Sequence, residues 1–332
     1  MIAFAPYTFL IVCLFVIPML VVWGCKVIEH HTKRKRHWKK SYGWVISLLF
    51  VLAIWAAVIY GSTIGFQKLE VHRYTFQSPA LPPAFNGYRI VQFSDAHVGS
   101  YSGNKKWILE KAIDSINAQH ADLIVFTGDL QNIEAQELDE HMQTLSRLKA
   151  KDGVYSVLGN HDYSMYLKGT ERQKQDNDKA VIRKEQEMGW TLLQNEHCII
   201  EREGERIIIA GMENDGNGKR FPQLGDINKT LDGISNDFVV MLEHDPASWR
   251  AKIVPDGRAQ LTLSGHTHAM QMMIGGWTPL ELTGRECNGW YQKGEQSLFV
   301  TKGLGGVIPF RLGATGEIVV ITLAVPSPSY RK

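Results

Sequence analysis

Two regions of the chain differ in how hydrophobic and polar residues follow one another. Residues 2–23 and 42–66 are long, uncharged apolar runs, whereas from Tyr88 onward short apolar runs alternate with segments of helical periodicity. Each long run has enough residues to cross a bilayer. The pattern therefore predicts two transmembrane helices followed by an α/β domain.

The α/β part is predicted to alternate strands with helices and then to become rich in strands. Helical spacing predicts helices at 105–119, 134–150 and 171–188, the last of them highly charged and solvated. Strands are expected at 88–95, 122–129, 153–162, 191–195, 198–202, 206–212, 237–245, 259–268, 296–305 and 316–325.

These elements predict four parts along the chain. Residues 1–66 are expected to form a transmembrane hairpin with a basic loop at 26–41. A linker at 67–87, a domain at 88–325 and a tail at 326–332 would follow. A cleaved signal peptide is the alternative for the first span, but that span lacks a basic start and a small-residue cleavage site.

Charge is distributed unevenly although the 332 residues carry a net charge of only +2. Lys and Arg concentrate in the loop between the two predicted spans, so the positive-inside rule predicts an integral membrane protein whose loop is cytoplasmic. The domain would then lie on the periplasmic or extracellular side. Contact of this loop with anionic lipid is expected, and nucleic acid is not an expected partner. Whether Cys198 and Cys287 pair in that compartment stays open.

Acidic residues, histidines and an asparagine follow the predicted strands at their carboxyl ends, where an open α/β sheet builds its sites. His266 and His268 are two positions apart, so in an extended or tightly turning segment they would approach one object together. Neutral imidazoles leave most of a metal ion's charge uncompensated, and acids must therefore join them. The residues at these strand ends are Asp95, His97, Asp129, Asn160, His161, Asp162, His244, His266 and His268.

Five short motifs, "SDAH", "TGD", "GNHD", "EHDP" and "GHTH", occur in this order between residues 94 and 268. Together they resemble the motif blocks of the calcineurin-like metallophosphoesterases, and the closing section "VTKGLGGVIPFRLGATGEIVVITL" resembles the membrane-associated YkuE-type branch of that family. The resemblance implies an α/β fold in which a β-sandwich of two mixed sheets is flanked by helices. It also implies a dinuclear metal centre on the loops at one edge.

The resemblance assigns a role to each residue at the strand ends. Asp95, His97 and His268 would hold one divalent ion, Asn160, His244 and His266 would hold the other, and Asp129 would bridge them. His161 would contact the phosphate and protonate the leaving oxygen, while Asp162 would orient that ring and raise its pKa. Manganese, zinc and iron all suit these ligands.

Three positions qualify the resemblance. Many relatives have an aspartate where this chain has Asn132, and many have two glycines where it has Ala269 and Met270, which restrict the backbone. Arg311 would either meet a substrate phosphate or form a structural salt bridge.

The function that follows is a membrane-anchored phosphoesterase that hydrolyses a phosphomonoester or phosphodiester by attack of metal-bound hydroxide. A lipid-linked substrate would suit a chain held at a bilayer. One alternative is a pyrophosphatase similar to the UDP-2,3-diacylglucosamine pyrophosphatase of lipid A synthesis, although its cytosolic substrate conflicts with the outward topology. Another is a non-catalytic binding module. The choice between mono- and diester and the oligomeric state stay open.

Overall fold

The computed structural model divides into two compact units, residues 1–65 and 66–332. The residues that the structure describes are 19, 20, 23, 24, 27, 41–216, 218 and 221–326.

The first unit contains a long apolar helix. The α-helix α3 (Ser41–Tyr60) continues as a five-residue π-helix, η3 (Gly61–Gly65). Within the described residues it provides one candidate membrane span, Leu48–Gly65. Its 18 residues would rise about 27 Å, close to the thickness of a bilayer's hydrocarbon core. The other predicted span, at 2–23, and the basic loop fall almost entirely outside the described residues, so the hairpin stays a prediction.

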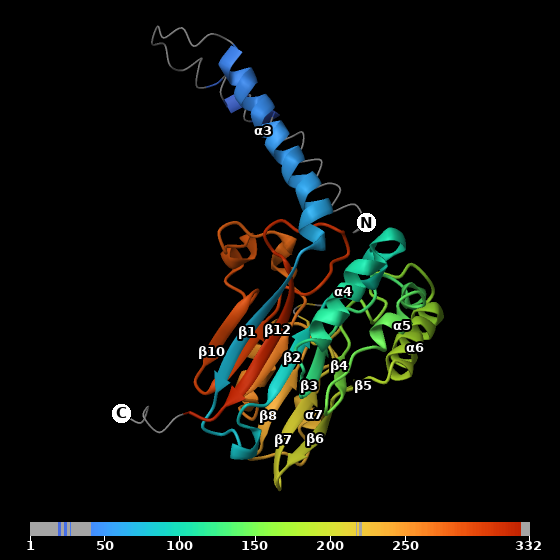
Figure 1. Cartoon of the computed structure of the whole chain (residues 1–332), viewed down its shortest axis with the longest axis vertical. Coiled ribbons are helices and arrows are strands. Elements are labelled where there is room, and N and C mark those ends of the chain that lie inside the picture. The colour runs from blue at the N-terminus through green and yellow to red at the C-terminus, as the bar shows by residue number, and fades with distance from the viewer. Residues whose placement is uncertain are drawn as a thin grey trace. The chain divides into compact units, whose positions relative to one another are not determined.

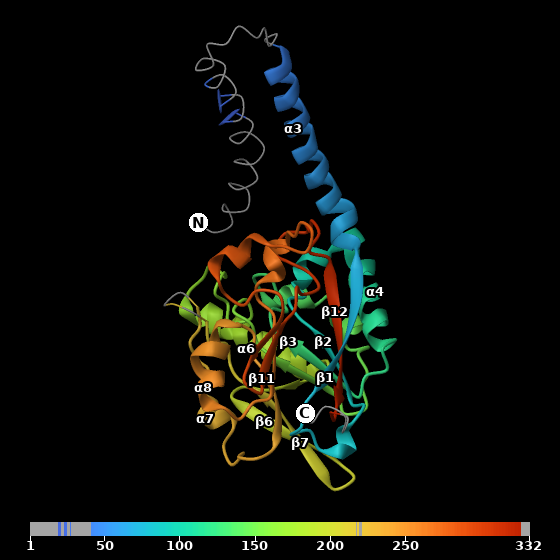
Figure 2. The same cartoon turned by 90° about the vertical axis from the view of Figure 1, so that its left-hand side faces the viewer.

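Two six-stranded sheets form the second unit, and both appear in Figures 1 and 2. The first sheet has the order β1-β12-β2-β3-β4-β5, with β1 Leu69–Gln77, β12 Gly316–Ala324, β2 Arg89–Phe93, β3 Leu123–Thr127, β4 Val154–Val157 and β5 Thr191–Leu192. The second has the order β10-β11-β9-β8-β7-β6, with β10 Gly289–Lys293, β11 Gln296–Val300, β9 Leu261–Ser264, β8 Phe238–Leu242, β7 Glu205–Gly211 and β6 Glu196–Arg202.

Each sheet mixes parallel and antiparallel pairs, as the resemblance implied. In the first sheet β2, β3, β4 and β5 run parallel, while β12 pairs antiparallel with β2. In the second sheet β7, β8, β9 and β11 run parallel, and the outer strands β6 and β10 are antiparallel. Because parallel strands end at a common edge, β2, β3 and β4 bring their carboxyl ends together, and β8 and β9 do the same.

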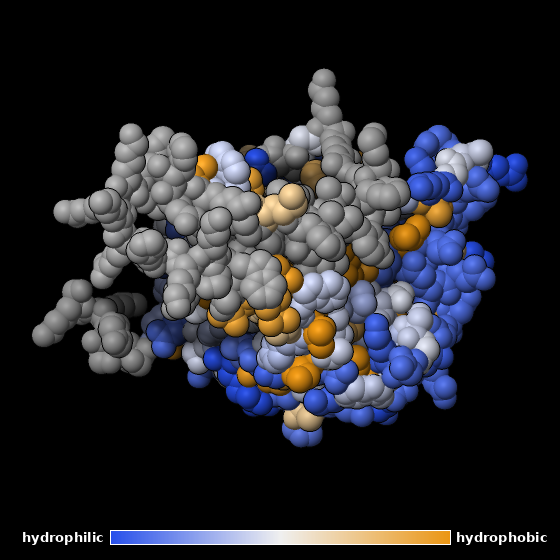
Figure 3. All heavy atoms as spheres, turned by 90° about the horizontal axis from the view of Figure 1, so that it is seen from above, coloured by the Kyte–Doolittle hydropathy of each residue, from blue (hydrophilic) through white to orange (hydrophobic). Residues whose placement is uncertain are grey.

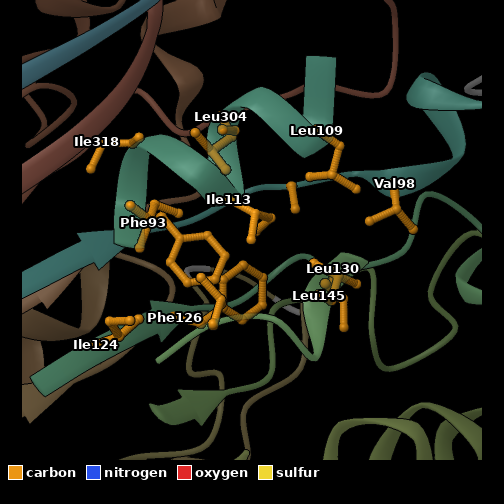
Figure 4. Close-up of a cluster of buried hydrophobic side chains, with 14 of the residues drawn as sticks. Phe93, Val98, Leu109, Ile113, Ile124, Phe126, Leu130, Leu145, Leu304 and Ile318 are labelled. Atoms are coloured by element: carbon orange, nitrogen blue, oxygen red, sulfur yellow. The ribbon is translucent and has the colours of Figure 1, made fainter. Parts of the chain in front are cut away.

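Apolar side chains fill the space between the sheets and cover their outer faces. Successive residues of β3 alternate between layers: Leu123 and Val125 pack in the cluster that also contains Val240 of β8, whereas Ile124 and Phe126 pack with residues of α4 (Lys106–Asn117). Figure 4 shows Ile113 of α4 beside Phe93 and Phe126, with Leu109 of the same helix toward Val98. Both faces of β3 are buried, which explains its continuous apolar sequence.

Short helices connect the strands and complete the outer layers. The helix α6 (Glu171–Glu187) confirms the charged helix predicted at 171–188. The remaining helices are η4 Pro83–Phe85, η5 Val98–Tyr101, η6 Gly103–Lys105, η7 Ala135–Leu138, α5 Met142–Leu145, α7 Ile227–Thr230, η8 Trp249–Ile253, α8 Val254–Asp256, η9 His268–Gln271 and η10 Pro279–Thr283.

Two sequence-based expectations differ from the structure. The segment 67–87, expected as a linker, contains β1, which pairs with β12 along its whole length, and Phe85 is fully buried. The single helix expected at 134–150 is two pieces, because a turn in which the His141 amide donates to the Leu138 carbonyl separates them. Both differences arise from tertiary contacts that local periodicity does not encode.

Candidate metal centre

The residues singled out from the sequence lie at the carboxyl ends of strands from both sheets. Asp95 and His97 follow β2, Asp129 follows β3, and the segment 160–162 follows β4. From the second sheet, His244 follows β8, and His266 and His268 follow β9.

The backbone is strained at this edge. Five of the seven predicted ligands have a positive φ, a conformation that costs an L-residue roughly 1–2 kcal/mol. Such strain persists only where the surroundings fix it, and it clusters at functional sites. The five are Asp95 (φ 51°), His97 (45°), Asp129 (62°), His266 (72°) and His268 (50°).

Two groups of potential metal ligands share one carboxylate. Donor atoms of Asp95, His97, Asp129 and His268 all lie within 4.8 Å of one another. Donor atoms of Asp129, His244 and His266 form a second such group. Asp95, His97, Asp129 and His244 are buried, and the two remaining members, His266 and His268, are partly exposed.

Backbone carbonyls determine which ring nitrogen of two histidines faces Asp129. His97 Nδ1 lies 3.2 Å from the Gln131 carbonyl oxygen, and His244 Nδ1 lies 2.7 Å from that of Thr127. Because a carbonyl oxygen only accepts, each Nδ1 donates its N–H. The Nε2 atoms point to Asp129 Oδ2, at 3.6 Å from His97 and 3.3 Å from His244. Acceptor atoms facing a carboxylate this closely require a shared cation or proton.

Further atoms at the centre also lack an ordinary hydrogen-bond partner. His97 Nε2 lies 3.2 Å from His268 Nε2, and His244 Nε2 lies 3.3 Å from His266 Nδ1. Among the described residues, Asn160 Oδ1 and His268 Nδ1 are buried without a hydrogen bond. Converging imidazole nitrogens, carboxylate oxygens and an amide oxygen are the donor set of a divalent transition metal. The residues therefore fit such an ion.

The pKa values of the histidines diverge within this cluster. Burial, together with the nearby His161, lowers the pKa of His97 to about 3. Burial would likewise lower the pKa of His244, but Asp129 outweighs it and raises that pKa to about 10. Burial would raise the pKa of Asp129, but His244, His161 and His97 together outweigh it and hold that pKa well below its usual value. The field around Asp129 thus favours a cation.

His161 lies at the border of the centre. Its backbone N–H donates to Asp129 Oδ1 over 2.8 Å, and its ring Nδ1 lies 2.6 Å from the Asn132 carbonyl oxygen. The ring meets His97 edge to face at 4.7 Å and is tilted by 30° against Tyr166 at 4.2 Å, both distances between ring centroids. With Nδ1 used, Nε2 is the ring nitrogen left for a substrate.

Asp162 has a different role from the one expected. Its buried carboxylate accepts backbone N–H groups of Asp129, Leu130, Gln131 and Gly159 at 2.8–3.2 Å. The ring of His161 is oriented by the Asn132 carbonyl instead. The expectation that Asp162 orients that ring is therefore wrong. Asp162 holds the turn after β3 against the turn after β4, and burial, with Asp129 adding, raises its own pKa to about 7.

Other residues at the centre were not assigned a role from the sequence. Asp245 Oδ2 lies 3.6 Å from His266 Nε2, and its position in "EHDP" was the available signal. No sequence pattern pointed to Tyr166.

Arg311 is fully buried and donates to carbonyl oxygens of Lys302, Gly303, Gly305 and Ala314, so it braces a loop rather than forming a salt bridge. Cys198 and Cys287 are both free thiols.

Comparison with known proteins agrees with this geometry. The model of the family described as calcineurin-like phosphoesterase matches residues 88–270. The chain belongs to the calcineurin-like phosphoesterase family. It is therefore a metal-dependent phosphoric ester hydrolase, a metallophosphoesterase, which favours catalysis over the binding-module alternative.

The names of individual relatives also contain the word metallophosphoesterase. The chain is 32% identical over 265 residues to the uncharacterized metallophosphoesterase YkuE of Bacillus subtilis, covering 77% of this chain and 85% of that protein. It is 28% identical over 329 residues to the Danio rerio transmembrane protein with metallophosphoesterase domain, covering 96% of this chain and 71% of that protein. Among solved structures, the phosphopantetheinyl hydrolase of Mycobacterium tuberculosis is similar with a TM-score of 0.42 and 13% identity, covering 68% of this chain and 92% of that one.

Proposed function

We propose that this metallophosphoesterase is a membrane-anchored enzyme that uses two divalent ions to hydrolyse a phosphomonoester or phosphodiester. The observation that carries the proposal is the carboxylate of Asp129, which belongs to two ligand groups at once. One carboxylate with two oxygens suits a bridge because it offsets charge on both ions.

The proposed ligands follow the two groups, with Asn160 added to the second. Asp95, His97 and His268 would hold one ion, His244, His266 and Asn160 would hold the other, and Asp129 would serve both. Two such ions would bind phosphate oxygens and lower the pKa of a water molecule so that it becomes a nucleophile at neutral pH. Manganese, zinc or iron would suit the mixed nitrogen and oxygen donors.

His161 is the proposed general acid. Its Nδ1–H is held by the Asn132 carbonyl, so a second proton on Nε2 makes the ring a cation that can donate to the leaving oxygen. Packing against Tyr166 and His97 limits how far the ring can turn. Asp162 is a positioning residue, because its carboxylate accepts a hydrogen bond from the Asp129 backbone N–H and so fixes the position of Asp129.

Membrane anchoring is supported by the apolar helix that ends at Gly65, one residue before the catalytic unit. We propose residues 88–325 as the catalytic domain, with β1 added to it, and the periplasmic or extracellular side as its location. A substrate at the surface of that membrane, such as a phosphorylated lipid, is within reach of an enzyme tethered so closely.

The test is metal-restored hydrolysis by the full chain in detergent. After chelation, manganese, zinc or iron is added back and paired generic phosphomonoester and phosphodiester substrates are assayed, with metal content measured per chain. Asp129→Ala is expected to lose both ions and all metal-dependent turnover, because both ligand groups contain Asp129. The matched control, Asp176→Ala on exposed α6, should keep both. Full activity in Asp129→Ala would exclude the shared ligand.

A further inference from the structure

Large apolar side chains are exposed on two loops beside the candidate metal centre. The loops run from residue 268 to 284, after β9, and from 303 to 312, after β11. Leu282 is 80% exposed and Ile274 is 70% exposed. We call the set the apolar rim; its members are Met270, Ile274, Trp277, Leu282, Val307 and Ile308.

Hydrogen bonds join the two loops to each other and to the centre. Gln271 Nε2 donates to the Ile308 and Phe310 carbonyls at 3.0 and 2.7 Å, and the Leu312 N–H donates to the Gln271 carbonyl at 2.9 Å. The first of the loops begins with His268, a predicted ligand. One of the two loops that form the apolar rim therefore begins at the centre, and the other is hydrogen-bonded to it.

Both loops contain very little charge for exposed segments. Residues 269–284 include one charged residue, Glu281, and residues 303–312 include one, the fully buried Arg311. Soluble proteins seldom expose contiguous apolar surface of this kind unless it meets a partner or a membrane.

The position of Met270 adds an independent observation. Ala269 (φ 48°) and Met270 (φ 56°) are both left-handed, at a cost of roughly 1–2 kcal/mol each. The Met270 side chain is nevertheless 45% exposed, so burial inside the domain does not offset that cost. An apolar side chain held at a strained and exposed position indicates contact with something outside the domain.

The connection between the candidate span and the domain favours the bilayer as that partner. The candidate span ends at Gly65, and Phe66 is already buried, with its ring stacked on Tyr101 at 5.3 Å. Ser100, next to Tyr101, donates its hydroxyl to the Gly306 carbonyl at 2.5 Å, at the start of the second rim loop. The chain thus enters the domain at Phe66, close to the start of the second rim loop.

A cation at the same entry point suits lipid headgroups. Lys105 Nζ lies 6.0 Å from the centroid of the Phe66 ring. A lysine beside a membrane surface attracts anionic headgroups, while its neighbours contact the acyl region. In Figures 1 and 2 the orange and red loops lie at the end of the domain where β1 begins. Figure 3 is a view from above, and where grey atoms do not cover the surface it shows hydrophobic residues among hydrophilic ones.

We propose that the apolar rim docks on the lipid bilayer and presents the metal centre to phosphate esters at headgroup depth. The proposal rests on the membrane anchoring and hydrolysis proposed above, and it specifies the substrate class as lipids whose scissile phosphate lies at the bilayer surface. A second copy of the chain would bury the same side chains. The bilayer is favoured because Phe66, which directly follows the candidate span, is already buried in the domain.

Photo-crosslinking of the full chain in phospholipid nanodiscs tests the docking. The photoreactive amino acid benzoyl-phenylalanine replaces Leu282 in one variant and Ile199 in the other. Ile199 is a matched control, an aliphatic residue 45% exposed on the edge strand β6. After illumination, lipid adducts are identified by mass spectrometry. We expect lipid adducts in the variant at position 282 and none in the variant at position 199.

Each alternative result overturns the docking. Absence of lipid adducts at 282, or equal yields at the two positions, would mean that the apolar rim does not meet the bilayer. A crosslinked dimer at 282 would identify a second copy as the occupant. Hydrolysis of generic esters is assayed separately on the same samples. Lipid adducts on a chain without metal-dependent turnover would leave the docking standing and contradict the proposed function alone.

Discussion

The two walls of the candidate metal centre are built differently. The wall formed by the loops after β3 and β4 is held by polar bonds, above all the four backbone N–H groups that donate to Asp162. The wall formed by the loops after β9 and β11 exposes apolar side chains and has backbone strain at Met270. The first construction fixes chemical groups in place, and the second offers a surface to a partner. Both walls contribute metal ligands, but only the second also exposes an apolar surface.

Removing the acid from the polar wall should have the largest effect. His161→Ala is expected to slow turnover by about 10²–10⁴-fold with poor leaving groups, because a general acid contributes that much. Good leaving groups need little protonation, so their rates should fall least. Metal content should stay at two ions per chain within error of wild type, since His161 is outside both ligand groups. Equal slowing for every leaving group would leave His161 only an orienting role.

Removing the carboxylate that holds this wall should cost stability. Asp162→Ala leaves buried backbone donors without an acceptor, at roughly 1–3 kcal/mol for each unsatisfied group. We expect a large drop in the thermal midpoint of the full chain in detergent and a loss of bound metal. Asp162→Asn keeps one acceptor oxygen and should lose less. A midpoint unchanged in Asp162→Ala would mean that these bonds do not organise the turn.

A buried acid behind the same wall should make stability depend on pH. Burial raises the pKa of Glu185 well above its usual value, with Asp162 adding, and Ser156 Oγ of β4 donates to its carboxyl group. The folded chain favours the protonated carboxyl group of Glu185. The stability that this group contributes is therefore complete below its pKa in the unfolded chain, and it is lost as pH rises through its pKa in the folded chain.

Glu185→Gln should therefore gain stability over wild type as pH rises above about 4.3, the pKa of an unfolded glutamate. The gain at neutral pH should approach about 1–3 kcal/mol, the cost of an imperfectly satisfied buried polar group. Thermal midpoints across the pH range measure it. Glu187→Gln, on the exposed side of α6, should show no such trend. A gain that is equal at every pH would exclude the titration of Glu185 as its cause.

The smallest effect concerns the strained wall. Met270→Gly should raise the thermal midpoint slightly, by the equivalent of at most about 1 kcal/mol, because glycine adopts a φ of 56° without strain. Met272→Gly, two residues on at a φ of −140°, is the control and should lower the midpoint. If Met270→Gly also lowers it, the left-handed backbone there is not a source of strain.

Much of the polar wall could be anticipated from the chain. Asp129 and the segment 160–162 follow continuous apolar runs, and such runs are typical of strands that are buried on both faces. The exact partners could not be anticipated. Which of two acceptors, Asp162 or the Asn132 carbonyl, takes the proton of His161 Nδ1 depends on differences of a few ångströms between turns that only packing sets.

The apolar wall was largely hidden in the sequence. Ile274 and Leu282 look like core residues there, because hydrophobicity alone does not say which side chains a fold leaves exposed. Similarly, the sequence of β1 did not indicate that it would pair with β12, in which Glu317 lies in register with Glu70, 247 residues earlier.

The sequence alone was enough for most of the elements, though not for β1, and for the kind of chemistry, because periodicity follows from side-chain geometry within one element and a metal needs particular donor atoms. The tertiary structure decided which donors converge, where the backbone is strained and which apolar residues face outward. Those properties depend on the packing of segments far apart in the chain, and no local pattern contains them.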